Sequence, residues 1–346
     1  MVIISDCLRN NVDEGAIKLA STLSKKLKQI GAKIVAVNSE CDFADVEVKA
    51  NKTFSNKSLY DSIGDTTDGI LYIPFASNTL GSAIRVFSLS RRTKSKVSVL
   101  FTISWEMGAL TKLLLKASGC QIITISQDSN TYFKRAFPNL QIINIKTGVD
   151  CSRFCKVDAQ KKKELRQKYK LPLDKTILLH VGHLKYGRNV DTFLNVDEKY
   201  YVVLVFSSVT EKERSLMKAL ESKDNIRIIC DYVPNVEEIY QASDIYVFPV
   251  VEENNSIDIP LSVLEAASCN LSIVSTAYKE ISFWDKRDGL YIVNDFNKEL
   301  INQYVEAAMQ FENIETDSIA KAYDWKNAVE NLQSVINDLD NGINKR

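Results

Sequence analysis

Short apolar segments alternate with amphipathic helical segments along almost the whole chain, and this alternation limits the possible folds more than any other feature. Helical spacing is clearest at 15–31, where Leu19, Leu23 and Leu27 recur on one face. Buried parallel strands are continuously apolar, because helices cover both faces of their sheet. The segments that fit such strands are 2–5, 33–37, 69–74, 96–101 and 121–126 in the first half, and 176–182, 200–206, 226–230, 244–250 and 271–276 in the second.

The length of 346 residues exceeds what one ordinary hydrophobic core accommodates. We therefore predict an α/β protein of two Rossmann-like, doubly wound domains with a cleft between them. The first domain is expected at 1–150 and the second at 151–322. Residues 323–346 are predicted to form a C-terminal helix that returns toward the first domain.

The charge of the chain is balanced overall but not along its length. Lys and Arg number 44, as do Asp and Glu, yet residues 1–150 carry 19 basic against 13 acidic side chains. The basic first half suggests an anionic partner, although a solvated charged face is the simpler interpretation of any one lysine. We expect no nucleic-acid partner.

Cysteine usage and hydropathy indicate a cytoplasmic protein. The seven cysteines are an odd number without zinc-like pairs, so we expect reduced thiols. No apolar run approaches the roughly 18 residues of a membrane span. The helical segment 107–118 is expected to bury its leucines, and the alternative is that it touches a membrane surface through them, with Lys112 and Lys116 beside it.

Ligands of open α/β sheets bind outside the carboxyl ends of the strands, which directs attention to the turns there. The turn after 176–182 reads HLKYGR and brings three cations, His183, Lys185 and Arg188, close to Gly182. Such a strand-to-helix turn suits a diphosphate, because a helix N-terminus and an arginine fork both favour anions. A solvated basic turn is the alternative. The turns that this rule selects are Asp6–Gly15, Pro74–Gly81, Thr102–Met107, Gly182–Asp191, Asp231–Asn235 and Glu252–Pro260.

A single carboxylate, Glu265, lies in a small apolar helix that we expect to run from Pro260 to about Ser268, with Asn270 as a left-handed stop. No Lys or Arg lies within one helical turn of it. The side chain either lies at the helix surface or faces the cleft, where an ionised carboxylate accepts two hydrogen bonds from a diol such as that of ribose.

Four segments in order resemble the family-4 retaining glycosyltransferases of the GT-B fold, also described as glycosyl transferases group 1. TGVDCSRF (147–154) resembles the start of that family's donor domain, and GHLKYGRNVD (182–191) resembles its G-R-L-x-x-x-K-G-x-D. DYVPN with IYQASDIYVFP (231–249) and PLSVLEAASCNLSIVST (260–276) resemble two later motifs. The resemblance covers almost all of the second half and is looser in the first.

The resemblance implies a retaining transfer from a UDP- or GDP-type sugar on the second domain to a glycan or lipid-linked acceptor on the first. Arg188, His183 and Lys185 would hold the diphosphate, Glu265 the ribose and the Val233 backbone the base. Arg188 and Glu265 would also be catalytic. No metal and no cofactor is implied, because those cations neutralise the leaving nucleotide. Other residues implied near the donor are Gly15, Gly182 and Leu264.

The chain departs from that family at informative places. The first glutamate of the family's E-x7-E motif falls on Ile257, so Asp258 or Glu253 would have to replace it. His183 stands where the family has arginine, and Glu106 is the acid offered on the acceptor side. A catalytically inactive relative that binds nucleotide-sugars or serves as a partner subunit is therefore the alternative function. Membrane contact from the cytoplasmic side, through the basic first domain, is a further expectation.

Overall fold

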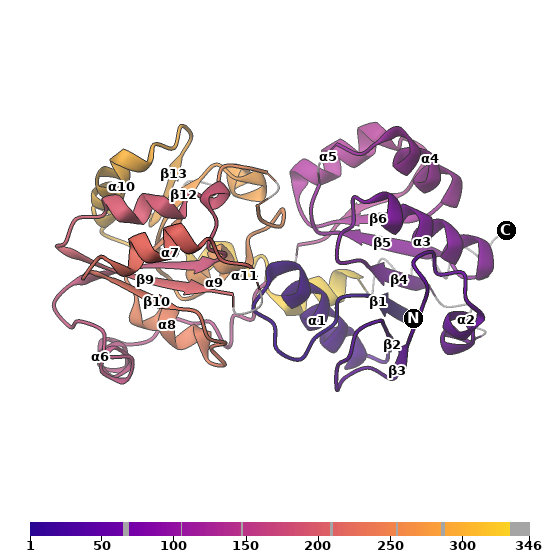
Figure 1. Cartoon of the computed structure of the whole chain (residues 1–346), viewed down its shortest axis with the longest axis horizontal. Coiled ribbons are helices and arrows are strands. Elements are labelled where there is room, and N and C mark those ends of the chain that lie inside the picture. The colour runs from indigo at the N-terminus through magenta and orange to yellow at the C-terminus, as the bar shows by residue number, and fades with distance from the viewer. Residues whose placement is uncertain are drawn as a thin grey trace. The chain divides into compact units, whose positions relative to one another are not determined.

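The computed structural model describes residues 1–64, 69–104, 106–146, 148–207, 210–253, 255–284 and 288–332. The chain divides into two compact units (Figure 1). Unit 1 contains Met1–Thr147, Ile257–Ile259 and the chain from Trp325 onward, and unit 2 contains Gly148–Ser256 and Pro260–Asp324. Sequence reasoning had assigned 257–259 to the second domain, and the structure places this short segment in unit 1 instead. Of the C-terminal helix predicted within 323–346, residues 325–332 are helical, and those from 333 onward lie outside the described residues.

Unit 1 is built on a parallel sheet with the strand order β3-β2-β1-β4-β5-β6-β7. In register, Val2 of β1 lies opposite Lys33 of β2 and Ile70 of β4, so the order of strands along the chain reverses between β1 and β4. The strands are β1 (Val2–Ser5), β2 (Lys33–Val37), β3 (Val46–Val48), β4 (Ile70–Ile73), β5 (Val97–Phe101), β6 (Gln121–Thr124) and β7 (Ile142–Asn144).

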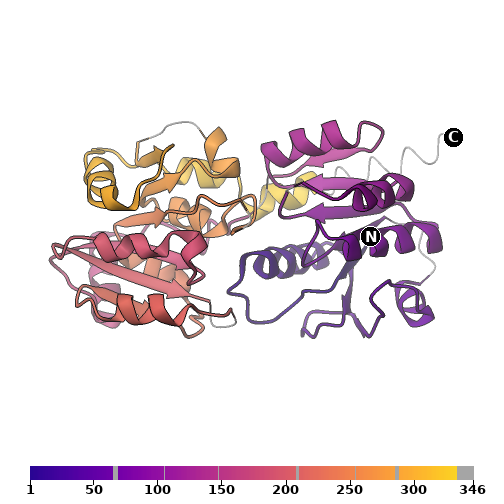
Figure 2. The ribbon, with the colours of Figure 1, turned by 45° about the horizontal axis from the view of Figure 1, so that its top comes forward.

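Helices cover both faces of this sheet (Figures 1 and 2). One face forms a continuous core with residues such as Val86 and Phe133, which come from the helices after β3. The other face receives the first helix, whose Leu19, Leu23 and Leu27 are fully buried, as the helical spacing predicted. The helices are α1 (Gly15–Lys28), α2 (Lys57–Ile63), α3 (Leu80–Arg92), α4 (Ala109–Ser118) and α5 (Gln127–Ala136).

Unit 2 repeats the same plan with the strand order β10-β9-β8-β11-β12-β13, again all parallel. Here the order reverses between β8 and β11. The strands are β8 (Thr176–Gly182), β9 (Tyr200–Phe206), β10 (Ile226–Ile229), β11 (Ile245–Phe248), β12 (Ser272–Thr276) and β13 (Leu290–Val293). The helices are α6 (Ala159–Lys168), α7 (Arg214–Glu221), α8 (Val236–Ala242), α9 (Leu261–Ser268), α10 (Ile301–Met309) and α11 (Asp317–Lys321), with 3-10 helices η1 (Tyr186–Arg188), η2 (Val190–Asn195), η3 (Lys279–Phe283) and η4 (Lys298–Leu300).

Helix α9 is buried along nearly its whole length, which explains its small apolar sequence. Gly148 approaches it closely: a Cβ atom there would lie 2.6 Å from Leu264 Cδ1 and 3.0 Å from Leu261 Cδ2, and its φ is +151°. Asn270 ends the helix with a φ of +56°, in the left-handed conformation predicted for it. The glycine of TGVD is therefore required by packing against α9.

All seven cysteines lie within the described ranges as free thiols, as expected. Among the helices of the described residues, none is both long and apolar enough to cross a membrane.

Candidate functional site

The turns that follow β8 and β11 form the candidate site of unit 2, because these neighbouring strands flank the point where the strand order reverses. Two asparagines join the turns. Asn189 Nδ2 donates to the Pro249 carbonyl at 2.9 Å, and Asn255 Nδ2 donates to the Gly187 carbonyl at 2.7 Å. A Cβ at Gly187 would lie 2.7 Å from Asn255 Nδ2, so the glycine permits this close approach.

Arg188 is 5% exposed, and its guanidinium lies against the backbone of Gly182. A Cβ at position 182 would lie 3.0 Å from Arg188 Nη2 and 3.1 Å from Cζ. The absence of a side chain at Gly182 therefore leaves space for the Arg188 guanidinium at the carboxyl end of β8. The same virtual atom would lie 3.0 Å from His180 Nε2, so the imidazole reaches this point as well.

His180 is fully buried and neutral. Its Nδ1 lies 2.9 Å from the Val247 carbonyl, which only accepts, so Nδ1 carries the proton. Nε2 then has a lone pair and no hydrogen-bond partner among the described residues. Burial, reinforced by the charge of Arg188, lowers the pKa of His180 to about 3. Sequence reasoning assigned no role to His180, although a histidine within an apolar strand two residues before Gly182 was a usable signal.

His183 and Lys185 extend from the same turn, the first partly exposed and the second exposed. The expected α-helix after this turn is absent: the chain continues in the short 3-10 helices η1 and η2. That part of the prediction was wrong, because left-handed Asn189 breaks the segment into two. Positive charge at this turn therefore comes from side chains and not from the N-terminus of a regular helix.

Glu265 is 2% exposed and accepts a hydrogen bond of 2.9 Å from the Tyr240 hydroxyl. Its partner thus comes from α8, 25 residues earlier in the chain, where inspection of the local sequence could not find it. Burial and then the Glu265 charge raise the pKa of Tyr240 well above its usual value, so the phenol stays protonated and donates. Whether ribose hydroxyls also reach this carboxylate stays a prediction.

Two tyrosines connect Glu265 with Arg188. Tyr246 on β11 stacks on Tyr240, with ring centroids 5.9 Å apart. Burial raises the pKa of Tyr246, while the Arg188 charge lowers it and the Glu265 charge raises it. The Tyr246 hydroxyl donates to the Val181 carbonyl at 3.3 Å, next to Gly182 and the Arg188 guanidinium, so Tyr240 and Tyr246 link Glu265 to the carboxyl end of β8.

The turn that contains Val233 is held by Arg153. Its Nη2 donates to the Pro234 carbonyl at 2.6 Å, and the guanidinium forms an ion pair of 2.6 Å with Glu237 on α8. Val233 itself is partly exposed. Leu264 is fully buried beside Gly148, so it supports α9 by packing.

Asp258 lies in unit 1, fully buried among serines. Its backbone N–H donates to the Thr102 carbonyl at 2.9 Å. Its carboxylate accepts from the Ser104 N–H at 3.1 Å and from the Ser129 hydroxyl. These bonds anchor 257–259, and a catalytic role for Asp258 stays a prediction that requires the segment to leave this cluster. Ile257 is 4% exposed and lies beside Gly15, whose virtual Cβ would be 3.7 Å from Ile257 Cδ1.

The remaining predicted acids are exposed. The Glu106 side chain is 90% exposed and lies 4.0 Å from Lys112. Glu253 pairs with Lys279 at 3.0 Å and is 66% exposed. Within the described part of the chain, no three His, Cys, Asp or Glu side chains gather in a way that could hold a metal ion.

Comparison with known proteins gives a family match over part of the second half and a likeness in fold over nearly the whole chain. Residues 175–310 match the family described as glycosyl transferases group 1. Comparison with curated protein sequences gives no match.

Several solved structures resemble the chain over nearly its whole length. A glycosyltransferase from Rickettsia africae has 13% identity and a TM-score of 0.77, covering 97% of this chain and 98% of that one. HepE of Anabaena in complex with UDP-glucose has 12% identity and a TM-score of 0.75, covering 97% and 99%. The catalytic domain of starch synthase IV from Arabidopsis thaliana, bound to ADP and acarbose, has 11% identity and a TM-score of 0.67, covering 97% and 98%. At such identities the likeness establishes the fold.

Proposed function

We propose that this protein, which has the GT-B fold and carries a glycosyl transferases group 1 domain at residues 175–310, transfers a sugar from a nucleotide-diphosphate donor to an acceptor. The observation that carries the proposal is the arrangement at the carboxyl ends of β8 and β11. There Gly182 admits the guanidinium of Arg188, and the buried carboxylate of Glu265 is linked to the same end of β8 through Tyr240 and Tyr246. A nucleoside diphosphate requires positive charge for its diphosphate and a hydrogen-bond acceptor for its ribose hydroxyls.

In the proposed reaction the bond between the anomeric carbon and the diphosphate oxygen breaks, and a bond from that carbon to an acceptor hydroxyl oxygen forms. Arg188, with Lys185 and His183 nearby, stabilises the negative charge on the leaving diphosphate, which takes the acceptor proton. We propose that the positive charge of these side chains stabilises the leaving diphosphate without a metal ion. Glu265 holds the ribose, and the turn at Val233 positions the base. The HepE complexes with UDP and UDP-glucose favour a uridine donor over a guanosine one, and retention is proposed by resemblance.

A non-catalytic role is the second candidate, and one observation favours it. Ile257 stands where the family has a carboxylate, and it is buried beside Gly15. A binding subunit would retain nucleotide affinity without turnover.

The site of action is proposed as the cytoplasm, at the inner face of a membrane if the acceptor is lipid-linked. Free thiols support a reducing compartment. On α4, Leu115 is buried as expected, but Leu110 and Leu113 are 55% and 60% exposed, next to Lys112 and Lys116. Co-sedimentation with anionic vesicles tests this part of the proposal.

Thermal-shift measurements with a panel of nucleoside diphosphates test the donor site. At a ligand concentration of 100 Kd, the folded state should gain about 2.7 kcal/mol. Hydrolysis of the matching nucleotide-sugar then separates the two candidates, because an active transferase slowly passes sugar to water whereas a binding subunit does not. Absence of stabilisation by every nucleotide would contradict both.

A further inference from the structure

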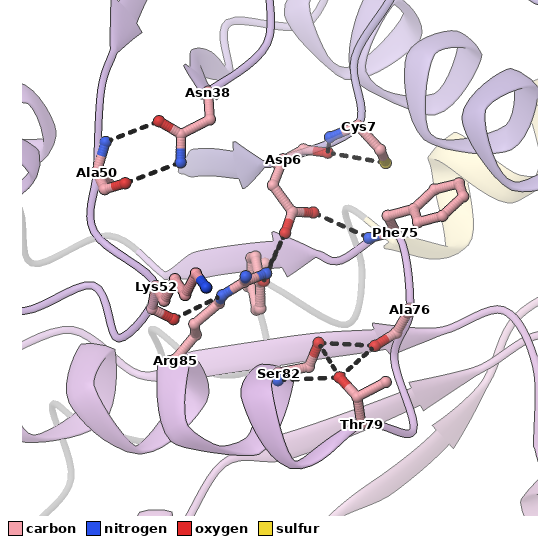
Figure 3. Close-up of polar contacts among 12 residues, drawn as sticks. Asp6, Cys7, Asn38, Ala50, Lys52, Phe75, Ala76, Thr79, Ser82 and Arg85 are labelled. Carbon is pink, nitrogen blue, oxygen red and sulfur yellow. Dashed lines mark hydrogen bonds and ion pairs between the residues drawn. The ribbon is translucent and has the colours of Figure 1, made fainter.

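Polar side chains gather in unit 1 at the carboxyl ends of β1 and β4, where Figure 3 shows the contacts around Asp6 and Arg85. These are the neighbouring strands between which the strand order reverses, the point where open α/β sheets place their ligands. A cavity of about 410 Å³ occurs there, within the range of roughly 300–1,000 Å³ of small-molecule sites. The residues that decide its chemistry are Asp6, Arg9, Phe75, Thr79, Ser82 and Arg85.

We propose that this cavity binds a singly charged oxyanion of the acceptor, held by the guanidinium groups of Arg85 and Arg9. The acceptor is then an acidic saccharide, with the charge on a carboxylate or on a phosphodiester. That the bound oxyanion belongs to the acceptor rests on the proposed glycosyl transfer, whereas the binding of an oxyanion rests on the geometry of unit 1 alone.

Arg85 is fixed before any ligand arrives. Its Nη1 donates to the carboxylate of Asp6 and to the Tyr72 hydroxyl, the latter at 3.2 Å. Its Nε donates to the Lys52 carbonyl at 3.1 Å, and the guanidinium lies over the Phe54 ring at 5.2 Å. Nη2 donates to none of the described residues, and the side chain is 24% exposed. A guanidinium held in this way loses little entropy when it binds.

Asp6 is occupied by this framework and is not open to bind a cation or a sugar hydroxyl. Its Oδ1 accepts from the Phe75 N–H at 2.9 Å, and its Oδ2 accepts from Arg85 and from the Tyr72 hydroxyl. Figure 3 shows the carboxylate between Arg85 and the backbone of Phe75. Asp6 therefore positions Arg85 and cancels one of the two guanidinium charges.

The hydroxyl groups that line the cavity already donate hydrogen bonds within the protein. The hydroxyls of Ser82 and Thr79 donate to the Ala76 carbonyl at 2.7 and 3.0 Å, so neither hydrogen points to a ligand. Burial raises the pKa of the Cys7 thiol to about 12, which keeps it uncharged. The remaining donors are those of Arg85 and of Arg9, whose Nη1 holds the Leu8 carbonyl at 2.9 Å and whose side chain is exposed.

The charges of the lining determine the class of ligand. Two guanidinium groups and one carboxylate leave a single positive charge, which matches one negative charge. Phe75 is 50% exposed at the same cavity and offers an apolar face to the ring of a sugar. The excess of basic residues in 1–150 attracts anions to this unit as a whole. An acidic saccharide combines the required charge with the required ring.

The test is ligand-observed NMR titration of the full chain with D-glucuronate, glycerophosphoglycerol and neutral D-glucose. We expect glucuronate or the phosphodiester to bind at least tenfold more tightly than glucose, and the stronger of the two identifies the oxyanion. Arg9→Ala, at an exposed position, should remove that preference. Arg85→Lys should weaken the preference without removing it, because lysine keeps the positive charge but lacks the two parallel donors of a guanidinium. Arg135→Ala, an equal change of charge at an exposed position on α5, should leave all affinities unchanged.

Equal affinities for the three ligands would overturn the inference, as would equal losses in Arg9→Ala and Arg135→Ala. Titration of the same samples with nucleoside diphosphates keeps this failure separate from that of the proposed function. A chain that binds the nucleotide but discriminates no oxyanion refutes the inference alone. A chain that binds the oxyanion but no nucleotide refutes the donor site and leaves the oxyanion site standing.

Discussion

The buried histidine of β8 makes the stability of unit 2 depend on pH, and His180→Leu should abolish that dependence. The pKa of His180 is about 3 in the folded chain and 6.5 in the reference state. Between these values the unfolded chain binds a proton that the folded chain excludes, so stability falls as the pH falls from about 6.5 to about 3. The free energy of unfolding changes by about 1.4 kcal/mol per pH unit in this window, which amounts to about 3 kcal/mol between pH 7 and pH 4.

Urea unfolding of wild type and His180→Leu at pH 7, 6, 5 and 4 measures this contribution, because other titrating groups cancel in the difference at each pH. At pH 7 the variant should be less stable by about 1 kcal/mol, since the Val247 carbonyl loses its donor. The order should reverse a little below pH 6, and at pH 4 the variant should be the more stable protein by about 2 kcal/mol.

Phe206→Leu is the matched control, because this buried ring lies 6.5 Å from the imidazole and does not titrate. It should lower stability by a similar amount at every pH and keep the wild-type slope. A difference between wild type and His180→Leu that stays constant from pH 7 to pH 4 would refute a neutral, proton-excluding histidine.

Three further variants test the donor site and its support. Arg188→Ala should weaken a nucleoside diphosphate tenfold to a hundredfold, about 1.5–3 kcal/mol by calorimetry, and leave the bare nucleoside unchanged; equal losses would place Arg188 elsewhere. Glu265→Gln should lower nucleotide affinity by about 1–3 kcal/mol while melting changes little, because the amide oxygen still accepts from Tyr240. A 2′,3′-dideoxy nucleotide should lose nothing on that mutation, and an equal loss would exclude a ribose contact. Gly148→Ala should cost roughly 1–3 kcal/mol in urea unfolding, because its Cβ meets Leu264 at 2.6 Å; Gly31→Ala, with φ also positive but no atom within 4 Å, should cost less.

Most strands could be predicted because they are continuous apolar runs that the sheets bury, whereas the short β3, with exposed Glu47, and β13 were not predicted. Tyr200–Phe206 forms β9 over its full predicted length. Some helices with few buried residues were not predicted from the sequence. Helix α5 has the polar sequence QDSNTYFKRA, and its buried residues are Ser129 and Phe133, too few for a recognisable period. Its start depends on the Ser126 cap, which accepts from the Ser129 N–H at 3.1 Å.

The candidate site could be predicted where its residues are close in sequence. Gly182 and Arg188 share one turn, and the motif containing Glu265 is local. Tyr240 and His180 could not be placed in this way. The role of His180 depends on β8 lying beside β11, and that of Tyr240 depends on α8 packing beside α9. Hydrogen bonds that join distant elements, such as that from Tyr240 to Glu265, leave no periodic trace in the sequence.

The segment 257–259 shows why a one-residue departure from a motif changes the chemistry available. Ile257 and Asp258 are both buried in unit 1, one beside Gly15 and the other among Ser104 and Ser129. A carboxylate at 257 would lose hydration in the apolar position, whereas the carboxylate at 258 has its donors in place. Freeing Asp258 for catalysis would leave those donors unpaired, at about 1–3 kcal/mol for each buried group. The proposed transfer therefore depends on the positive charge around Arg188, so its rate should respond strongly to Arg188 and weakly to any change at Ile257 that preserves the packing.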